Sequence, residues 1–153
     1  MRTSLEMGNR EIVHVISSRD ASTIVAQVHE TRLMRRFKDF LSFESFTGEL
    51  QYASDHPEKS RLRIDIDASS VVCRDSSLRA SKQQRLAEYV RDLALNAAAH
   101  PSIQFSSYQI STKALRGLIV EGALTLCGTT KAVKMNAVFS ERNANRLDIE
   151  ADS

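Results

Sequence analysis

The side chains that most often perform catalysis or bind metals are few and scattered in this sequence. They are four histidines and two cysteines: His14, His29, His56, His100, Cys73 and Cys127. No two histidines have the spacing that places two ligands on one metal ion, and the cysteines lack the paired spacing of a zinc site. The chain also lacks the Gly-x-Ser-x-Gly sequence that presents a nucleophilic serine. We therefore predict a non-enzymatic protein without metal or cofactor and with two free thiols. An enzymatic site assembled from separate strands around Cys73 or Cys127 is the alternative.

One short segment concentrates positive charge. Residues 32–38 read Arg-Leu-Met-Arg-Arg-Phe-Lys. Guanidinium and ammonium groups donate charge-assisted hydrogen bonds to phosphate oxygens, so Arg35, Arg36 and Lys38 are candidates for binding a phosphate head group. The alternative is a solvated face of an irregular loop, since exposed clusters of this size are common. Nucleic acid is not expected as a partner, because the net charge is only +2 and no recognised binding motif is present.

Length and composition indicate a single domain over 1–153. The chain has 153 residues, of which 42% are hydrophobic and 26% are charged. A chain of this length buries roughly two thirds of its unfolded surface, so it needs neither disulfides nor a metal for stability. No stretch reaches the roughly 18 apolar residues of a membrane-spanning helix, and residues 1–11 carry charge where a secretory signal is apolar. We therefore expect a cytoplasmic protein with no transmembrane segment.

Alternation of apolar and polar residues predicts that most of the chain is β-strand. Residues 61–68 alternate strictly between apolar and charged side chains. The same period recurs in four later segments: 103–105, 118–126, 133–139 and 147–151. Turn-like residues separate these segments, which predicts an antiparallel meander. Three further strands are expected: 11–16, 22–30 and 40–51. Gly48 and Gly122 lie inside strands, where glycine commonly marks a bend, a bulge or a close approach.

One segment has helical periodicity instead. Its apolar residues recur every three or four positions: Leu86, Tyr89, Val90, Leu93 and Ala97. Residues 81–84, Ser-Lys-Gln-Gln, have the form of a capping box, and Pro101 disfavours helix in the residue before it. We predict a helix over about 81–99, with His100 at its C-terminal end. The predicted fold class is mainly β, an antiparallel barrel of about eight strands with one amphipathic helix.

Four segments are similar, in order and spacing, to the YceI-like family. His100–Ser107 resembles the family's strand y-P-x-I-x-F-x-S, and Val120–Val133 resembles its hairpin v-x-G-x-L-T-l-h-G-v-t-k-x-v. Phe46–Leu50 is similar to f-x-G-x-l, and Leu62–Ser70 is similar to l-x-i-x-i-d-a-s-S-l. Together the four segments span most of residues 22–138.

The resemblance implies a bacterial, lipocalin-like β-barrel that binds or transports an isoprenoid-type lipid, a polyprenyl chain or a quinone, without catalysis. The family also has periplasmic members. An eight-stranded barrel is either filled by side chains or open for one slender ligand, so the same apolar residues could form a dry core. The candidate lumen residues are Ile24, Val28, Phe43, Phe46, Leu62, Ile64, Ile66, Phe105, Leu118, Val120, Leu124, Leu126, Met135 and Phe139.

The sequence departs from the family pattern in two places. Cys127 stands where the family commonly has a histidine before the hairpin glycine, so no role of that histidine carries over. The family usually continues for one or two strands beyond the segment that here ends at Ser153. If this end is natural, the barrel is incompletely closed and leaves an edge strand that tends to pair with another chain. The alternative function is a filled interaction module that pairs through this edge with a second copy, as a homodimer, or with another protein. A chain that lacks its last strands is the other explanation of the early end.

Overall fold

Ten strands and one α-helix make up most of the described chain. The computed structural model describes the backbone of residues 11–17, 24–32, 35–53, 56–114, 117–139 and 147–150, and the side chains of residues 41–53, 56–114 and 117–136. The strands are β1 (Glu11–Ser17), β2 (Ile24–Arg32), β3 (Arg35–Phe43), β4 (Phe46–Ala53), β5 (Arg61–Asp67), β6 (Val71–Cys73), β7 (Ser102–Lys113), β8 (Gly117–Leu126), β9 (Thr129–Phe139) and β10 (Leu147–Glu150). The helical segments are η1 (Pro57–Lys59), η2 (Ala68–Ser70), α1 (Ala80–Tyr89) and the π-helical η3 (Val90–Ala94). The predicted mainly β class is confirmed.

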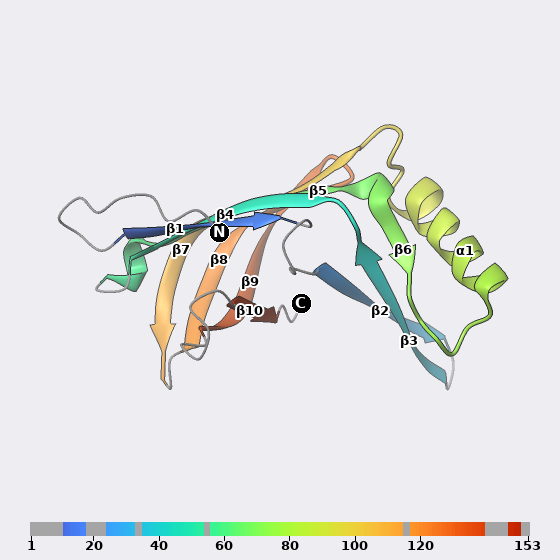
Figure 1. Cartoon of the computed structure of the whole chain (residues 1–153), viewed down its shortest axis with the longest axis horizontal. Helices are drawn as coiled ribbons and strands as arrows, with labels where there is room; N and C mark the ends of the chain where they lie inside the picture. The colour runs from blue at the N-terminus through green and yellow to red at the C-terminus, as the bar shows by residue number, and fades with distance from the viewer. Residues whose placement is uncertain are drawn as a thin grey trace.

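The strands form two antiparallel sheets. The larger sheet has seven strands in the order β1-β4-β5-β7-β8-β9-β10, and the smaller has three in the order β2-β3-β6. From β7 to β10 each strand pairs with the next one along the chain, so the predicted meander is confirmed. Figure 1 shows the larger sheet curving at one end of the molecule, and the smaller sheet and α1 at the other end.

The expected barrel is not closed within the described part of the chain. β1 and β10 are the two edges of the seven-stranded sheet, where they pair with β4 and β9 respectively. β2 and β3, which a single barrel would have to include, pair with each other and with β6. The described ranges therefore form two open sheets, and their ten strands outnumber the eight expected. Among the described strands, β10 lies at an edge of the larger sheet.

The segment predicted as one strand over 40–51 is interrupted at Glu44 and Ser45. β3 ends before these residues and β4 begins after them, in the other sheet. Ser70 fixes the interruption, because its carbonyl accepts a hydrogen bond from the Glu44 N–H at 3.2 Å and its hydroxyl accepts one from the Ser45 N–H at 3.1 Å. The chain thus changes sheets at a point set by a residue 25 positions away.

Strand alternation determines which side chains of the larger sheet share a face. Residues opposite each other in register point to the same side of a sheet. Leu62 pairs with Leu50, and Ile64 pairs with Phe105. The pairing continues through β8 and β9, where Val120 lies opposite Met135. One face of the sheet is therefore apolar over β4, β5, β7, β8 and β9, while the other carries polar residues such as Thr47, Arg63, Asp65, Gln104 and Lys134.

A β-bulge in β7 shifts this alternation. The register between β7 and β8 changes between Ser107 and Gln109, so that Ile110 rather than Gln109 faces the apolar side opposite Val120. Near the bulge, a Cβ atom at Gly122 would lie 2.5 Å from both Phe105 Cζ and the carbonyl oxygen of Ser106. Gly122 therefore marks a close approach, as predicted, and its missing side chain leaves room for the Phe105 ring against β8.

The helix starts without the predicted capping box. Its N-cap position is Arg79, and no side chain makes a capping hydrogen bond there. The Gln83 amide instead donates to the carbonyl oxygens of Asp75, at 2.6 Å, and Leu78, at 3.3 Å. Ser81 already lies inside the helix, so the interpretation of residues 81–84 as a capping box was wrong.

The helix also ends earlier than predicted. α1 continues as η3 only to Ala94, because Asn96 adopts a left-handed φ of 45°, a conformation that commonly terminates helices. His100 lies beyond this end, and its backbone N–H donates to the Asn96 carbonyl at 2.8 Å. The stop signal is therefore Asn96, and Pro101 comes five residues later.

The predicted hairpin between β8 and β9 is confirmed and contacts the end of the helix. Cys127 and Gly128 have φ values of 50° and 72°, and positive φ at both central residues is what a type I′ turn requires. The Cys127 thiol donates to the carbonyl oxygens of Ala94, at 3.5 Å, and Leu95, at 3.3 Å. The thiol thus satisfies carbonyls that the end of a helix leaves without an intrahelical donor.

Two groups of buried apolar side chains stabilise the fold. The helix-side cluster comprises Leu41, Phe43, Ala68, Val71, Cys73, Ala97 and Ile103. The sheet-side cluster comprises Leu50, Leu62, Phe105, Ile110, Leu118 and Val120. Half-buried Leu124 packs against both clusters. Within the described ranges, no helix is long and apolar enough to span a membrane.

Candidate functional site

The apolar face of the larger sheet is the most extended candidate for a binding surface. Its centre is the sheet-side cluster, in which Leu62, Ile110 and Val120 are each 2% exposed. Five half-buried residues, all on strands of the same sheet, pack around this centre: Tyr52, Ile64, Leu124, Val133 and Met135. No residue of α1 belongs to the group, in contrast to the helix-side cluster. The face therefore combines a buried centre with an apolar margin that stays partly accessible.

Half of the predicted lumen residues lie in this group. Leu62, Phe105, Leu118 and Val120 are buried members of the sheet-side cluster, and Ile64, Leu124 and Met135 lie at its margin. The structure separates the others from this centre. Phe43 belongs to the helix-side cluster with Ile66 packed against it, while Leu126 is 38% exposed near the β8–β9 turn. Phe46 is buried but belongs to neither cluster, and the side chains of Ile24, Val28 and Phe139 lie outside the described residues.

Sequence reasoning missed two buried members of the sheet-side cluster. Leu50 alternates with Phe46 and Gly48, so the period-two pattern already contained the signal for it. Ile110 has the wrong parity relative to Phe105, because the bulge inserts one residue between them. No feature of the sequence alone would have indicated that shift.

The predicted head-group residues lie on a strand and not in a loop. Arg35, Arg36 and Lys38 belong to β3, where they pair in register with Arg32, Thr31 and His29 of β2. The irregular-loop interpretation was therefore wrong. Their side chains lie outside the described residues, so the structure does not relate them to the sheet-side cluster.

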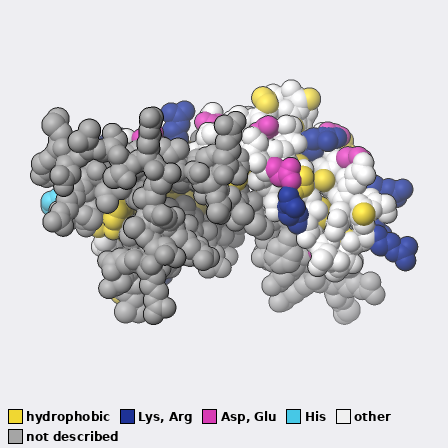
Figure 2. Space-filling model, in the orientation of Figure 1, with side chains coloured by type: hydrophobic (Ala, Val, Ile, Leu, Met, Phe, Trp, Pro, Cys, Tyr) yellow, Lys and Arg dark blue, Asp and Glu magenta, His cyan; other side chains and the backbone are white. Residues whose placement is uncertain are grey.

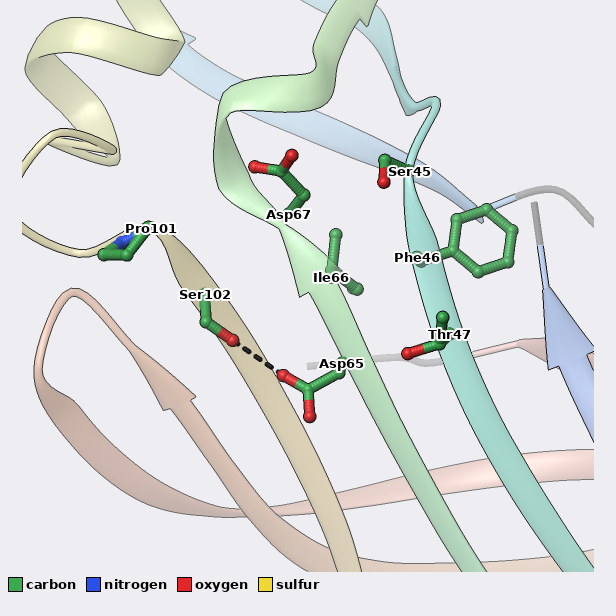
Figure 3. Close-up of a pocket in the computed structure, with 8 residues that line it drawn as sticks. All are labelled: Ser45, Phe46, Thr47, Asp65, Ile66, Asp67, Pro101 and Ser102. Atoms are coloured by element: carbon green, nitrogen blue, oxygen red, sulfur yellow. Dashed lines mark hydrogen bonds between the residues drawn. The ribbon is translucent and has the colours of Figure 1, made fainter. Parts of the chain in front are cut away.

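A shallow pocket of about 260 Å³ opens where β4, β5 and the start of β7 meet. Figure 3 shows Asp65 and Ser102 pointing toward each other across it, and the Phe46 ring pointing away from them. Asp65 Oδ1 accepts hydrogen bonds from the Ser102 hydroxyl at 2.7 Å and the Gln104 amide at 3.2 Å, and Oδ2 lies 3.8 Å from Arg63 Nη2. Through these contacts the Asp65 carboxylate links β5 to β7. It is therefore not a free acid or base at this position of the pocket.

The histidines and cysteines form no reactive group in the described part of the chain. His56 Nδ1 lies 3.1 Å from Glu58, and a backbone hydrogen bond together with this histidine lowers the pKa of the exposed Glu58 carboxyl. Cys73 is buried in the helix-side cluster and Cys127 bonds to the helix end, and both thiols are free. No three His, Cys, Asp or Glu side chains with defined positions come together as metal ligands. The side chains of His14 and His29 lie outside the described residues.

Comparison with known proteins identifies the family. A family model described as the YceI-like domain matches residues 18–152. The chain belongs to the YceI-like family. The predicted resemblance is thereby confirmed, and the family is one of binding proteins.

Individual relatives are distant. A UPF0312 protein of Azotobacter vinelandii is 29% identical over 99 residues, which cover 64% of this YceI-like chain and 47% of the relative. The chain thus spans about half the length of that curated relative. Burkholderia cenocepacia BcnA superposes with a TM-score of 0.62 at 16% identity, covering 86% of this chain and 69% of BcnA. The Campylobacter jejuni YceI protein superposes with a TM-score of 0.55 at 12% identity, covering 86% of this chain and 72% of the Campylobacter protein. At these identities the solved structures show a shared fold.

Proposed function

We propose that this YceI-like protein binds the apolar chain of an isoprenoid-type lipid on the sheet-side cluster. The observation that supports the proposal is the partly accessible apolar margin on β5, β8 and β9, formed by Ile64, Leu124, Val133 and Met135. These residues surround a buried centre on a face that lacks contacts from α1. A lipid chain that covered them would gain roughly 25 cal/mol per Å² of apolar surface removed from water.

The buried centre would act as the floor of the site. Phe105 is 6% exposed, and its ring lies over Gly122. This arrangement fills the space between β7 and β8 with one aromatic side chain and leaves the ligand to pack against the margin. A slender, unbranched or methyl-branched chain suits an apolar surface that extends across several strands, whereas a compact polar metabolite does not.

Arg35, Arg36 and Lys38 are proposed as the partners of a phosphate head group on chemical grounds, since guanidinium and ammonium groups donate strongly to phosphate oxygens. They share strand β3. Their role can be tested by measuring the affinity for a polyprenyl phosphate and for the corresponding polyprenol. Both affinities are measured for the native chain and for a variant in which all three residues are changed to glutamine. We expect the variant to lose the preference for the phosphate and keep its affinity for the alcohol.

The deciding experiment for lipid binding is native mass spectrometry of protein purified from its host, before and after organic extraction. An extractable adduct with the mass of an isoprenoid supports the proposal and identifies the ligand. The proposal fails if the protein is recovered without any adduct and if a fluorescent apolar probe, N-phenyl-1-naphthylamine, binds no better than it does to an unrelated β-protein of similar size.

One observation favours a second candidate function, an interaction module that pairs through a sheet edge. β10 pairs with β9 on one side, and no described strand lies on its other side. Unpaired backbone groups at such an edge can accept a strand from another chain. Sedimentation equilibrium over a range of protein concentrations tests this proposal, and a monomer at every concentration would contradict it.

A further inference from the structure

The outward face of the helix carries a stripe of exposed residues that the lipid-binding proposal does not use. Lys82, Arg85, Tyr89 and Leu93 follow one another at spacings of three or four residues, which places them in a row along one side of the helix. All four are exposed, with Tyr89 at 58% and Leu93 at 71%. We call this row the helix stripe.

The adjoining side of the helix faces the protein. Half-buried Leu86, Ala87 and Val90 pack against the helix-side cluster, so the helix is anchored without the helix stripe. Tyr89 and Leu93 are two of the four large apolar side chains that stay exposed among the described residues. Figure 2 shows Lys and Arg side chains along the end of the molecule where α1 lies, with hydrophobic side chains among them.

Among the described side chains, none neutralises the positive charge of the helix stripe. Lys82 and Arg85, together with neighbouring Arg79, form no ion pair with any residue whose side chain is described. The acidic side chains of the helix are engaged elsewhere. Asp92 forms two hydrogen bonds with Arg91, at 2.7 and 3.0 Å, and Glu88 accepts one from Gln84 at 3.0 Å.

The position of these cations works against the stability of the helix. The first turn of a helix carries partial positive charge and favours acidic residues, whereas here Arg79 is the N-cap, Lys82 lies in the first turn and that turn contains no acid. Just before the helix, the Asp75 carboxylate accepts hydrogen bonds from the Ser77 N–H at 2.9 Å and the Ser77 hydroxyl at 2.6 Å. A charge pattern that opposes the helix dipole and remains unpaired is better explained by an external anionic partner than by folding.

We propose that the helix stripe docks the protein on a membrane surface that carries anionic head groups. The cations would lie among the head groups, and Tyr89 and Leu93 would enter the boundary with the acyl chains. A mixed row of basic, aromatic and aliphatic side chains on a convex helix matches a broad, deformable bilayer surface. An acidic protein would have to supply a groove for the same convex row. The proposal rests on the proposed function in one respect, because docking would bring a lipid carrier to the source of its ligand.

The test is flotation of the full chain with vesicles of phosphatidylcholine alone or of phosphatidylcholine with phosphatidylglycerol. We expect binding to the anionic vesicles only. The change of Lys82→Gln with Arg85→Gln should weaken that binding roughly thirtyfold, given the attraction of an anionic surface for each basic residue near it. A second variant, Tyr89→Ser with Leu93→Ser, should weaken it as well, and both should retain the circular dichroism spectrum of the native chain because all four residues are exposed.

Matched controls lie on the large sheet. Lys113→Gln with Lys131→Gln removes two exposed cations from β7 and β9, and Tyr108→Ser removes a tyrosine that is 65% exposed on β7. Both control variants should bind the anionic vesicles as the native chain does. The proposal is overturned if the native chain does not float with anionic vesicles, if the stripe variants bind like the controls, or if only an acidic polypeptide such as polyglutamate is bound.

Lipid content measured on the same samples separates this proposal from the lipid-binding one. Stripe variants that lose vesicle binding but still contain an extractable isoprenoid after loading in detergent support both proposals. A native chain that floats with anionic vesicles yet never yields an extractable lipid refutes lipid binding and leaves docking intact. A native chain that contains lipid but does not float refutes docking alone.

Discussion

The two apolar clusters of this YceI-like protein differ in what covers them. Against the helix-side cluster pack Leu86, Ala87 and Val90 of α1 and η3, so a helix closes it on one side. Among the described side chains, those that pack around the sheet-side cluster all belong to its own sheet, and they are half-buried. Both clusters have half-buried apolar margins, but the described margin of the sheet-side cluster lies on strands alone, which makes it the candidate surface for a ligand. The difference predicts that equal changes in the two clusters will have equal effects on folding and unequal effects on binding.

Leu41→Ala and Leu62→Ala are the most direct way to break this comparison. Each leucine is 2% exposed, the first in the helix-side cluster and the second in the sheet-side cluster. Each change should lower the free energy of unfolding by about 2–5 kcal/mol, because it leaves a cavity in a packed core. Urea unfolding followed by circular dichroism measures this loss, since the chain has no tryptophan.

Binding of an apolar probe to the same two variants separates the clusters. Only Leu62→Ala should change the affinity for N-phenyl-1-naphthylamine, because Leu62 lies beneath the proposed ligand. An equal change of affinity in the Leu41→Ala variant would contradict the assignment of the site to the sheet-side cluster.

Two glycines provide a second matched pair. Gly122→Ala should lower the free energy of unfolding by about 1–3 kcal/mol, because the new methyl group would overlap both the Phe105 ring and the Ser106 carbonyl. Gly128→Ala, at the hairpin beside the helix end, should cost about 1–2 kcal/mol, because its φ of 72° is left-handed. Thermal or urea unfolding gives both values.

The stability lost in Gly122→Ala and in Gly128→Ala has different physical causes, and a second substitution in each variant should distinguish them. Phe105→Leu should relieve Gly122→Ala only in part, since the contact with the Ser106 backbone persists. His100→Ala should not rescue Gly128→Ala, although the methyl group would lie 2.9 Å from His100 Cε1, because the strain is in the backbone. Full rescue by His100→Ala would show that steric contact dominates.

Met135→Gln and Leu86→Gln sharpen the comparison at the margins of the two clusters. Both residues are half-buried and apolar. Met135 lies at the margin of the sheet-side cluster, and Leu86 belongs to α1 and packs against the helix-side cluster. Met135→Gln nearly conserves volume but places an amide against the ligand, and it should weaken probe binding about tenfold while changing stability little. Leu86→Gln should lower stability and leave probe affinity unchanged. Titration of the probe at constant protein concentration measures the difference, and a reversed pattern would place the ligand beside the helix.

The sequence predicted which side of each strand is buried better than it predicted which strands pair with each other. Alternation identified Leu62, Phe105 and Val120 as inward-facing, because side-chain direction depends only on local backbone geometry. Closure of a barrel depends on which strands pair across long sequence separations. The break at Glu44 and Ser45 is held by Ser70, and nothing local at that point signals it.

Exceptions to local periodicity explain the remaining differences. A single inserted residue in the β7 bulge brought Ile110 into the candidate site against the alternation. The helix ended at Asn96 because an asparagine adopted the left-handed conformation that is more often given to glycine. The motif-based resemblance found the family, since it rests on the order of four segments and not on their pairing.

The smallest expected effect is electrostatic and concerns the entry to the helix. Hydrogen bonds from the Ser77 side chain and backbone lower the pKa of the Asp75 carboxyl. A carboxyl whose pKa is lowered by folding stabilises the native state above its ordinary pKa, and this contribution disappears as the pH falls through the lowered value. Asp75→Asn keeps an oxygen acceptor for Ser77 but removes the charge, so it should weaken the native state slightly at neutral pH.

The difference between the native chain and Asp75→Asn should vanish in acid, where the native carboxyl is protonated. Glu58→Gln, in η1 between β4 and β5, is the matched change on the sheet side, because the pKa of Glu58 is also lowered, mainly by a backbone hydrogen bond. Urea unfolding from neutral to acid pH should show that both changes lower stability at neutral pH. Neither should affect probe binding, since neither residue belongs to the sheet-side cluster or packs at its margin. A change of probe affinity in Asp75→Asn alone would mean that the helix entry communicates with the ligand, and the helix-side region would then have to be counted as part of the site.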